Sequence, residues 1–135
     1  VAFAQKSRAA GLNVIYLVAP TTTTARMQAT AQVASGFIYY VSLKGVTGAG
    51  TLDVSDVTQK VGVLRQYTDL PIHVGFGISD ATSAQAVAQT ADGVVIGSKL
   101  ITLIESAVAE GADPNPALSA WLLDIRTALD NLTVA

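Results

Sequence analysis

The chain alternates short, mostly apolar runs with segments of helical periodicity, and this alternation restricts its fold more than any other feature. The apolar runs lie at residues 14–18, 37–41, 71–74 and 93–96. Runs of this length and apolarity suit strands that are buried on both faces. Strands that alternate strictly with helices form a parallel sheet covered by helices. The sequence therefore predicts an α/β fold with four parallel strands.

Helices are predicted before, between and after these strands. Val54, Val57, Val61 and Leu64 show the helical spacing most clearly, because they recur on one face of a 3.6-residue period. The other predicted helices cover residues 1–10, the stretch from the threonines at 21–24 to about 34, and residues 80–90, 100–108 and 118–129. No linker and no repeat interrupts this order, so we expect a single domain over residues 1–135.

The composition excludes several classes of protein. Charged residues make up 13% of the 135 residues, about half of the usual share, so part of the surface is expected to be apolar and covered by something other than water. The net charge of −2 and the scattered basic residues give no support to nucleic-acid binding. The absence of cysteine and the single histidine argue against a metal site.

The sequence also bears on localisation. No apolar run approaches the eighteen residues of a membrane span. The first residues lack the order of charges and apolar residues found in a signal peptide. The chain begins without Met and as if a helix were already under way, which favours a cytoplasmic protein that has been cut at its N-terminus.

Two of the predicted strands run directly into glycines and then into a helix. The strings are Gly-Phe-Gly-Ile-Ser at 75–79 and Ile-Gly-Ser at 96–98. Glycines at a strand end let a ligand approach the backbone, and the following helix N-terminus offers free N–H groups to an anion. The alternative is that these are turn glycines and helix caps, which fits any one of them equally well. For the set, on successive strand ends, we favour a phosphate site.

Three strings in this order and spacing resemble the α subunit of tryptophan synthase: residues 45–48 (Gly-Val-Thr-Gly), 75–79 and 96–98. Residues 39–42 and 19–20 add support, and the string at 45–48 is the most specific. The resemblance covers nearly the whole chain and points to the C-terminal half of the family, strands five to eight. That family is a (β/α)₈ barrel of the TIM type, which needs about 250 residues. The chain is therefore expected to form about half a barrel.

The resemblance implies a lyase of tryptophan biosynthesis. The family cleaves indole-3-glycerol phosphate into indole and glyceraldehyde 3-phosphate in a retro-aldol reaction, which needs one acid and one base. In the family these are a glutamate and an aspartate of the N-terminal half, so we expect no catalytic acid or base in this chain, and no activity from the chain alone. No cofactor is expected in this subunit. Pyridoxal phosphate belongs to the partner β subunit of an expected α₂β₂ complex.

The resemblance also assigns residues to the phosphate end of the substrate. Gly48, Gly77, Gly97 and Ser98 would hold the phosphate through backbone N–H groups, with one further bond from the Ser98 hydroxyl. Thr47 would close over the site as part of a lid and orient the aspartate that the chain lacks. Without the resemblance, Thr47 reads as an ordinary turn residue.

The indole pocket is the second site that the resemblance implies. It would be lined by Leu17, Tyr39, Phe76 and Val95, which lie at or near strand ends. Without the resemblance, Leu17 and Val95 read as plain core residues. His73 is expected to be structural and to face the helix layer, because it lies within a strand in which Phe76 alternates with Val74.

Other polar or aromatic residues are expected to have structural roles. Asp92 precedes a strand and is interpreted as a turn or capping residue, and Trp121 as a packing residue of the last helix. Two alternatives stay open: another phosphate-binding TIM barrel, and an inert half-barrel that serves folding or assembly. Four strands without partners leave two open sheet edges, which favour association with a missing half or a second copy.

Overall fold

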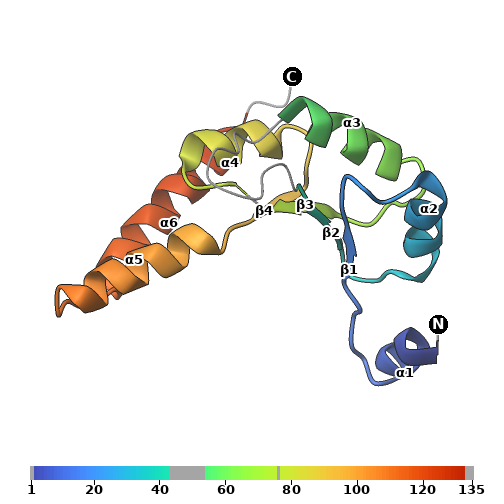
Figure 1. The fold of residues 1–135 in the computed structure, drawn as a ribbon, viewed down its shortest axis with the longest axis horizontal. Coiled ribbons are helices and arrows are strands. Elements are labelled where there is room, and N and C mark those ends of the chain that lie inside the picture. Colours follow the sequence, from blue (N-terminus) through green and yellow to red (C-terminus); the bar gives the residue numbers. More distant parts are fainter. Residues whose placement is uncertain (1, 43–53, 76, 133–135) are drawn as a thin grey trace.

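A computed structural model of the chain describes residues 2–42, 54–75 and 77–132 (Figure 1). Its elements follow one another as strand and helix, which confirms the predicted order and the α/β class with four parallel strands. The elements are α1 (Ala2–Ala9), β1 (Tyr16–Val18), α2 (Thr24–Val33), β2 (Ile38–Val41), α3 (Val54–Leu64), β3 (Ile72–Gly75), α4 (Ala81–Ala88), β4 (Gly93–Val95), α5 (Ser98–Ala109) and α6 (Asn115–Asp130).

The sheet has the strand order β1-β2-β3-β4, and all three strand pairs are parallel. Each strand is followed by a helix that returns the chain to the start of the next strand, and this connection makes neighbouring strands parallel. All four strands consequently end at one edge, which we call the carboxyl edge. Any site built from strand ends must lie there.

One face of the sheet carries the core. The side chains of Ile38, Tyr40, Ile72 and Val74 point to this face and are completely buried. They pack with residues of α2, α3, α4 and α6. In Figure 1, α3 and α4 lie along this side of the sheet, while α5 and α6 extend beyond β4 as a helical hairpin. The opposite side, which we call the open face, carries the alternate strand residues.

His73 lies on the open face, and the prediction that it faces the helix layer is wrong. Its neighbours Ile72 and Val74 are both fully buried against the helices, so the alternation of a strand directs His73 to the other side. That prediction requires Val74 to share the side of Phe76, away from the helices. Phe76 lies outside the described residues, and Val74 belongs to the core.

Local signals place the helix ends. Gly11 and Gly36 adopt φ angles of 76° and 78°, a conformation that favours glycine, directly after α1 and shortly after α2. Asp80 caps the N-terminus of α4 in a capping box. Its carboxylate accepts a hydrogen bond from the Ser83 N–H at 2.7 Å, and the Ser83 hydroxyl oxygen accepts one from the Asp80 N–H at 3.3 Å. None of the helices within the described ranges is both long enough and apolar enough to cross a membrane.

Candidate functional site at the carboxyl edge

The carboxyl edge brings two of the predicted glycines side by side. Gly75 of β3 pairs with Val95 of β4. Gly77 and Gly97 follow these paired residues by two positions each, so they leave neighbouring strands at the same level of the edge. Gly77 has a φ of 75° and turns the chain sharply towards α4. Both glycines are exposed, as expected for a place where a ligand approaches from solvent.

The N-terminus of α4 has a side-chain cap, whereas the N-terminus of α5 has none. Asp80 places a carboxylate over the first turn of α4. Gly97, the residue before α5, gives no side-chain cap, and a Cβ built on it meets no atom within 4 Å. The first-turn N–H groups of an α-helix have no partner inside the helix. At α5 no side chain caps them, and an uncapped helix N-terminus suits an anion.

Three of the predicted site residues, Thr47, Gly48 and Phe76, lie outside the described residues. The structure therefore places Gly77, Gly97 and Ser98 of the phosphate set, and Leu17, Tyr39 and Val95 of the indole set.

The three placed indole residues share the open face. Leu17, Tyr39, His73 and Gly93 form one row across the four strands, in that order. Val95 lies one row nearer to the carboxyl edge. Leu17 is 64% exposed, so the alternative that it is a plain core residue is excluded within the described chain. An aliphatic side chain that protrudes beside a tyrosine makes an apolar surface for a flat ligand.

Two glycines on the open face accommodate aromatic rings, a role that sequence reasoning missed. A Cβ on Gly75 would lie 2.5 Å from the Tyr39 hydroxyl oxygen, and a Cβ on Gly93 would lie 2.9 Å from the His73 ring. Each ring leans over the glycine of the next strand. These pairs form because of the register in which the strands are aligned. That register cannot be read from any short stretch of the sequence.

His73 is held by a second ring. Its imidazole stacks on Phe37 with a centroid separation of 4.2 Å and an interplanar angle of 21°. Phe37 immediately precedes β2, so the stack ties the start of that strand to β3. The half-buried imidazole therefore has a defined position on the open face.

Tyr40 differs sharply from its neighbour Tyr39. It points to the core face, and burial together with the nearby Asp56 carboxylate raises the pKa of its hydroxyl to about 12. Because the side chain of Tyr40 is completely buried on the core face, it does not reach the residues of the open face. Tyr39 alone presents a phenol to the carboxyl edge.

The structural roles expected for Asp92 and Trp121 find support in the contacts. The Asp92 carboxylate accepts bonds from the Ile72 N–H at 2.8 Å and from the Arg65 guanidinium at 2.9 Å, which ties the amino ends of β3 and β4 to α3. Trp121 is more than a packing residue, because its indole N–H donates to the Ser79 carbonyl at 3.3 Å. That bond anchors α6 to the loop that carries Gly77.

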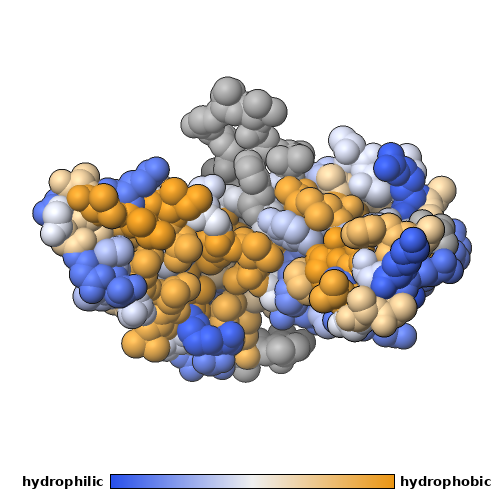
Figure 2. Space-filling model, turned by 90° about the horizontal axis from the view of Figure 1, so that it is seen from below, coloured by the Kyte–Doolittle hydropathy of each residue, from blue (hydrophilic) through white to orange (hydrophobic). Residues whose placement is uncertain are grey.

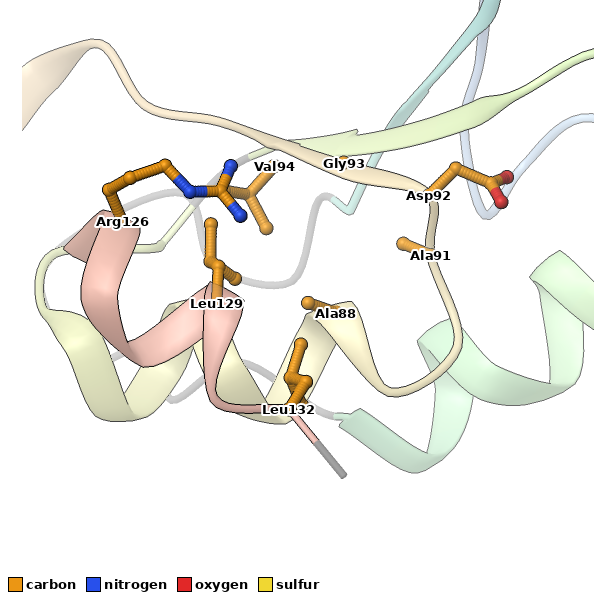
Figure 3. Close-up of a pocket in the computed structure, with 8 residues that line it drawn as sticks. All are labelled: Ala88, Ala91, Asp92, Gly93, Val94, Arg126, Leu129 and Leu132. Carbon is orange, nitrogen blue, oxygen red and sulfur yellow. The ribbon is translucent and has the colours of Figure 1, made fainter. Parts of the chain in front are cut away.

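A cavity of about 280 Å³ lies between β4, α4 and α6 (Figure 3). It lies beside Asp92 and Gly93, at the amino end of β4, and small or aliphatic side chains such as Ala88, Leu129 and Leu132 line much of it. None of the predicted site residues lines it. In barrels this end is associated with stability and the carboxyl end with activity, so we do not assign this cavity to the site.

No group of three or more His, Cys, Asp or Glu side chains in residues 2–42, 54–75 and 77–132 could hold a metal ion. The groups that Gly77, Gly97, Ser98 and Tyr39 offer at the carboxyl edge are instead backbone N–H groups, a serine hydroxyl and a phenol. Groups of this kind suit an anionic ligand with an aromatic ring.

Comparison with known proteins agrees with this arrangement. Residues 1–122 match the family model described as tryptophan synthase alpha chain. The tryptophan synthase alpha chain of Burkholderia multivorans is 53% identical over 128 residues, which cover 95% of this chain and 46% of that protein. The alpha chain of Laribacter hongkongensis is also 53% identical and is covered to 47%. The chain thus spans about half the length of the curated relatives it matches.

Solved structures show the same relation. Tryptophan synthase subunit alpha from Legionella pneumophila superimposes with a TM-score of 0.82 and 35% identity, over 97% of this chain and 47% of that one. Tryptophan synthase from M. tuberculosis in an aminoacrylate-bound form superimposes with a TM-score of 0.75 and 30% identity, over 95% and 44%. The four-stranded sheet therefore corresponds to half of such a barrel.

Proposed function

Since this chain belongs to the tryptophan synthase alpha chain family, we propose that it is the C-terminal half of such a subunit and supplies strands five to eight of its barrel. The position of the phosphate candidates supports this half. TIM barrels commonly bind phosphate with the loops after strands seven and eight and with a short helix N-terminus. Gly77 follows the third strand here, and Gly97 and Ser98 follow the fourth.

The substrate in this proposal is indole-3-glycerol phosphate. Its phosphate binds to backbone N–H groups at Gly48, Gly77 and Gly97 and to the Ser98 hydroxyl. The observation that carries the assignment is the pair of adjacent strand ends, β3 and β4, one followed by a positive-φ glycine and the other by an uncapped helix. Fixed N–H dipoles hold an anion without a lysine or arginine.

The indole ring occupies the open face below the phosphate. Leu17, Tyr39 and Val95 provide its apolar wall, together with Phe76. Tyr39 is held over Gly75, two residues before Gly77. Tyr39 and Val95 thus lie next to Gly75, which puts the two sites within reach of one substrate molecule.

The chemistry requires groups that this chain does not supply. An acid protonates C3 of the indole ring and a base removes the proton of the glycerol hydroxyl, so that the bond between C3 and the glycerol carbon breaks as a carbonyl forms. Both groups come from the N-terminal half in this proposal. The chain contributes substrate binding, orientation and the lid residue Thr47, and is inactive alone.

The whole subunit works with a β subunit in an α₂β₂ complex in the cytoplasm. Indole passes to the β subunit, where pyridoxal phosphate is bound, and this chain needs no cofactor of its own. These partners follow from family membership.

The phosphate site is tested by placing a negative charge in it. We call "the completed subunit" this chain joined to the part of the Burkholderia multivorans relative that it does not match. In Gly97→Asp the new Cβ meets no described atom within 4 Å. The carboxylate would occupy the place of the phosphate, so the KM for indole-3-glycerol phosphate should rise at least about tenfold.

Gly62→Asp is the matched control. Gly62 lies on α3, is exposed and also has open space around a built Cβ. The same change there should leave KM unaltered. An unchanged KM in Gly97→Asp, with activity retained, would exclude the phosphate assignment.

A further inference from the structure

The open face carries one nitrogen-bearing side chain that the proposed function leaves unused. His73 stands in the row of Leu17 and Tyr39, between Tyr39 and Gly93. Its ring is half-buried. No hydrogen bond or ion pair links its nitrogens to any other residue within the described ranges.

The position of the imidazole is fixed by packing on two sides. Phe37 stacks on one side at 4.2 Å. Gly93 lies beneath, where even a methyl group would come within 3.0 Å of the ring nitrogen Nε2. A ring that is held in place but lacks a polar partner is ready to bind one, because little side-chain entropy remains to be lost.

The row of His73 is the deeper of the two rows on the open face. Val95 and Gly75 lie two residues nearer to the carboxyl edge, which is about 7 Å along a strand. A substrate that is anchored by its phosphate at that edge reaches His73 with the opposite end, the benzene ring of its indole. This step rests on the proposed function.

We propose that His73 determines specificity, by giving the deep wall of the indole pocket a hydrogen-bonding group for a hydroxyl on the benzene ring of indole. A neutral imidazole has one donor and one acceptor nitrogen, and a hydroxyl can complement either. Unsubstituted indole leaves the imidazole unpaired, while a hydroxyindole pairs with it. Sites that hold a polar group for a substrate hydroxyl discriminate against the analogue without it.

The test uses the completed subunit in the synthetic direction, with glyceraldehyde 3-phosphate and either indole or each of the 4-, 5-, 6- and 7-hydroxyindoles. The measured quantity is the ratio of kcat/KM for the best hydroxyindole to that for indole. His73→Leu should lower this ratio by about fivefold, the effect of one neutral hydrogen bond. His73→Gln, which keeps a donor and an acceptor, should retain most of it.

Gln66→Leu is the control for a change from a polar residue to leucine, because Gln66 is exposed beyond the end of α3. It should leave the ratio unchanged. A ratio that is the same in the parent protein and in His73→Leu, with indole still used, overturns this inference alone. If the parent completed subunit uses neither indole nor hydroxyindoles, the proposed function fails and this inference fails with it.

Discussion

At the scale of single residues, Gly75 and Gly93 show how pairing between strands decides what a glycine does. Gly75 belongs to the string that predicts a phosphate site, yet the structure gives it a packing role beneath Tyr39. The motif could be found in the sequence because it is contiguous. The packing of rings over the glycines could not be found in the sequence. Tyr39 lies 36 positions before Gly75 and contacts it only because of the register of β2 and β3.

Gly75→Ala should destabilise the completed subunit by about 1–3 kcal/mol. The new methyl group would lie within 2.9 Å of three atoms of Tyr39, so the rigid ring must rotate out of its position. Urea unfolding measures the loss. The control is Gly62→Ala in an open position of α3, which should instead stabilise by about 0.5–1 kcal/mol, the usual gain from alanine in a helix. Equal stability of the two variants would contradict the packing role.

The orientation of His73 is the clearest failure of prediction at this scale. Alternation along a strand fixes which residues share a face, but the sequence must also say which of the two sets is buried. In β3 the alternation separates Ile72 and Val74 from His73, but strands of a parallel sheet can be covered on both faces, so the pattern does not say which set faces the helices. The fully buried Ile72 and Val74 resolve the choice.

At the scale of elements, the periodic segments were predictable and their packing partners were not. Helical spacing correctly located α3, with Val57, Val61 and Leu64 as its buried stripe. The same reasoning gave the helix predicted at 118–129, which is α6, but Leu122 within it stays 48% exposed. Among the described elements α6 packs mainly against α4, so only part of its apolar surface is covered.

The cap of α4 should contribute measurably to stability. Asp80→Ala removes the acceptor of the Ser83 N–H and should cost about 1 kcal/mol, whereas Asp80→Asn keeps an acceptor and should cost only a few tenths. The difference between the two variants isolates the cap from the loss of side-chain volume. Chemical denaturation of the completed subunit at pH 7 measures both values, and an Asp80→Ala protein as stable as the parent would contradict the cap.

The cap also has a predictable pH dependence. Bonds from the Ser83 N–H and hydroxyl hold the pKa of Asp80 below its ordinary value. The folded state therefore favours the ionised carboxylate, and the stabilisation is complete above the unfolded pKa of about 4 and declines as the pH falls through the lower folded value. The parent protein should lose stability relative to Asp80→Asn as the pH falls below about 4.

At the scale of the whole molecule, the chain exposes surface that a complete barrel would cover. Figure 2 shows apolar atoms gathered over a broad part of the face seen from below. The large exposed apolar side chains of the described ranges include Leu17 on the sheet, Ile101 and Val108 on α5, and Leu123 on α6. Both outer strands, β1 and β4, also have an edge without a partner strand in the described chain. The low content of charged residues predicts such an exposed apolar surface. The match to half of a solved barrel explains it, because the other half would cover this surface.

The purified chain alone should therefore associate. Open parallel edges and exposed leucines and isoleucines favour contact with a second copy. Sedimentation velocity should show species larger than a 13.9 kDa monomer, and addition of the complementary half of the Burkholderia multivorans relative should replace them with a one-to-one complex. A single monomeric species that does not respond to this half would contradict the account.

The division of labour between the two halves is the central claim, and release of indole from indole-3-glycerol phosphate tests it most directly. In our proposal the chain supplies binding groups at the carboxyl edge, while the acid and the base come from the other half. The account predicts no indole above background from the purified 135-residue chain and steady release from the completed subunit under the same conditions. Release by the chain alone at a comparable rate would contradict it.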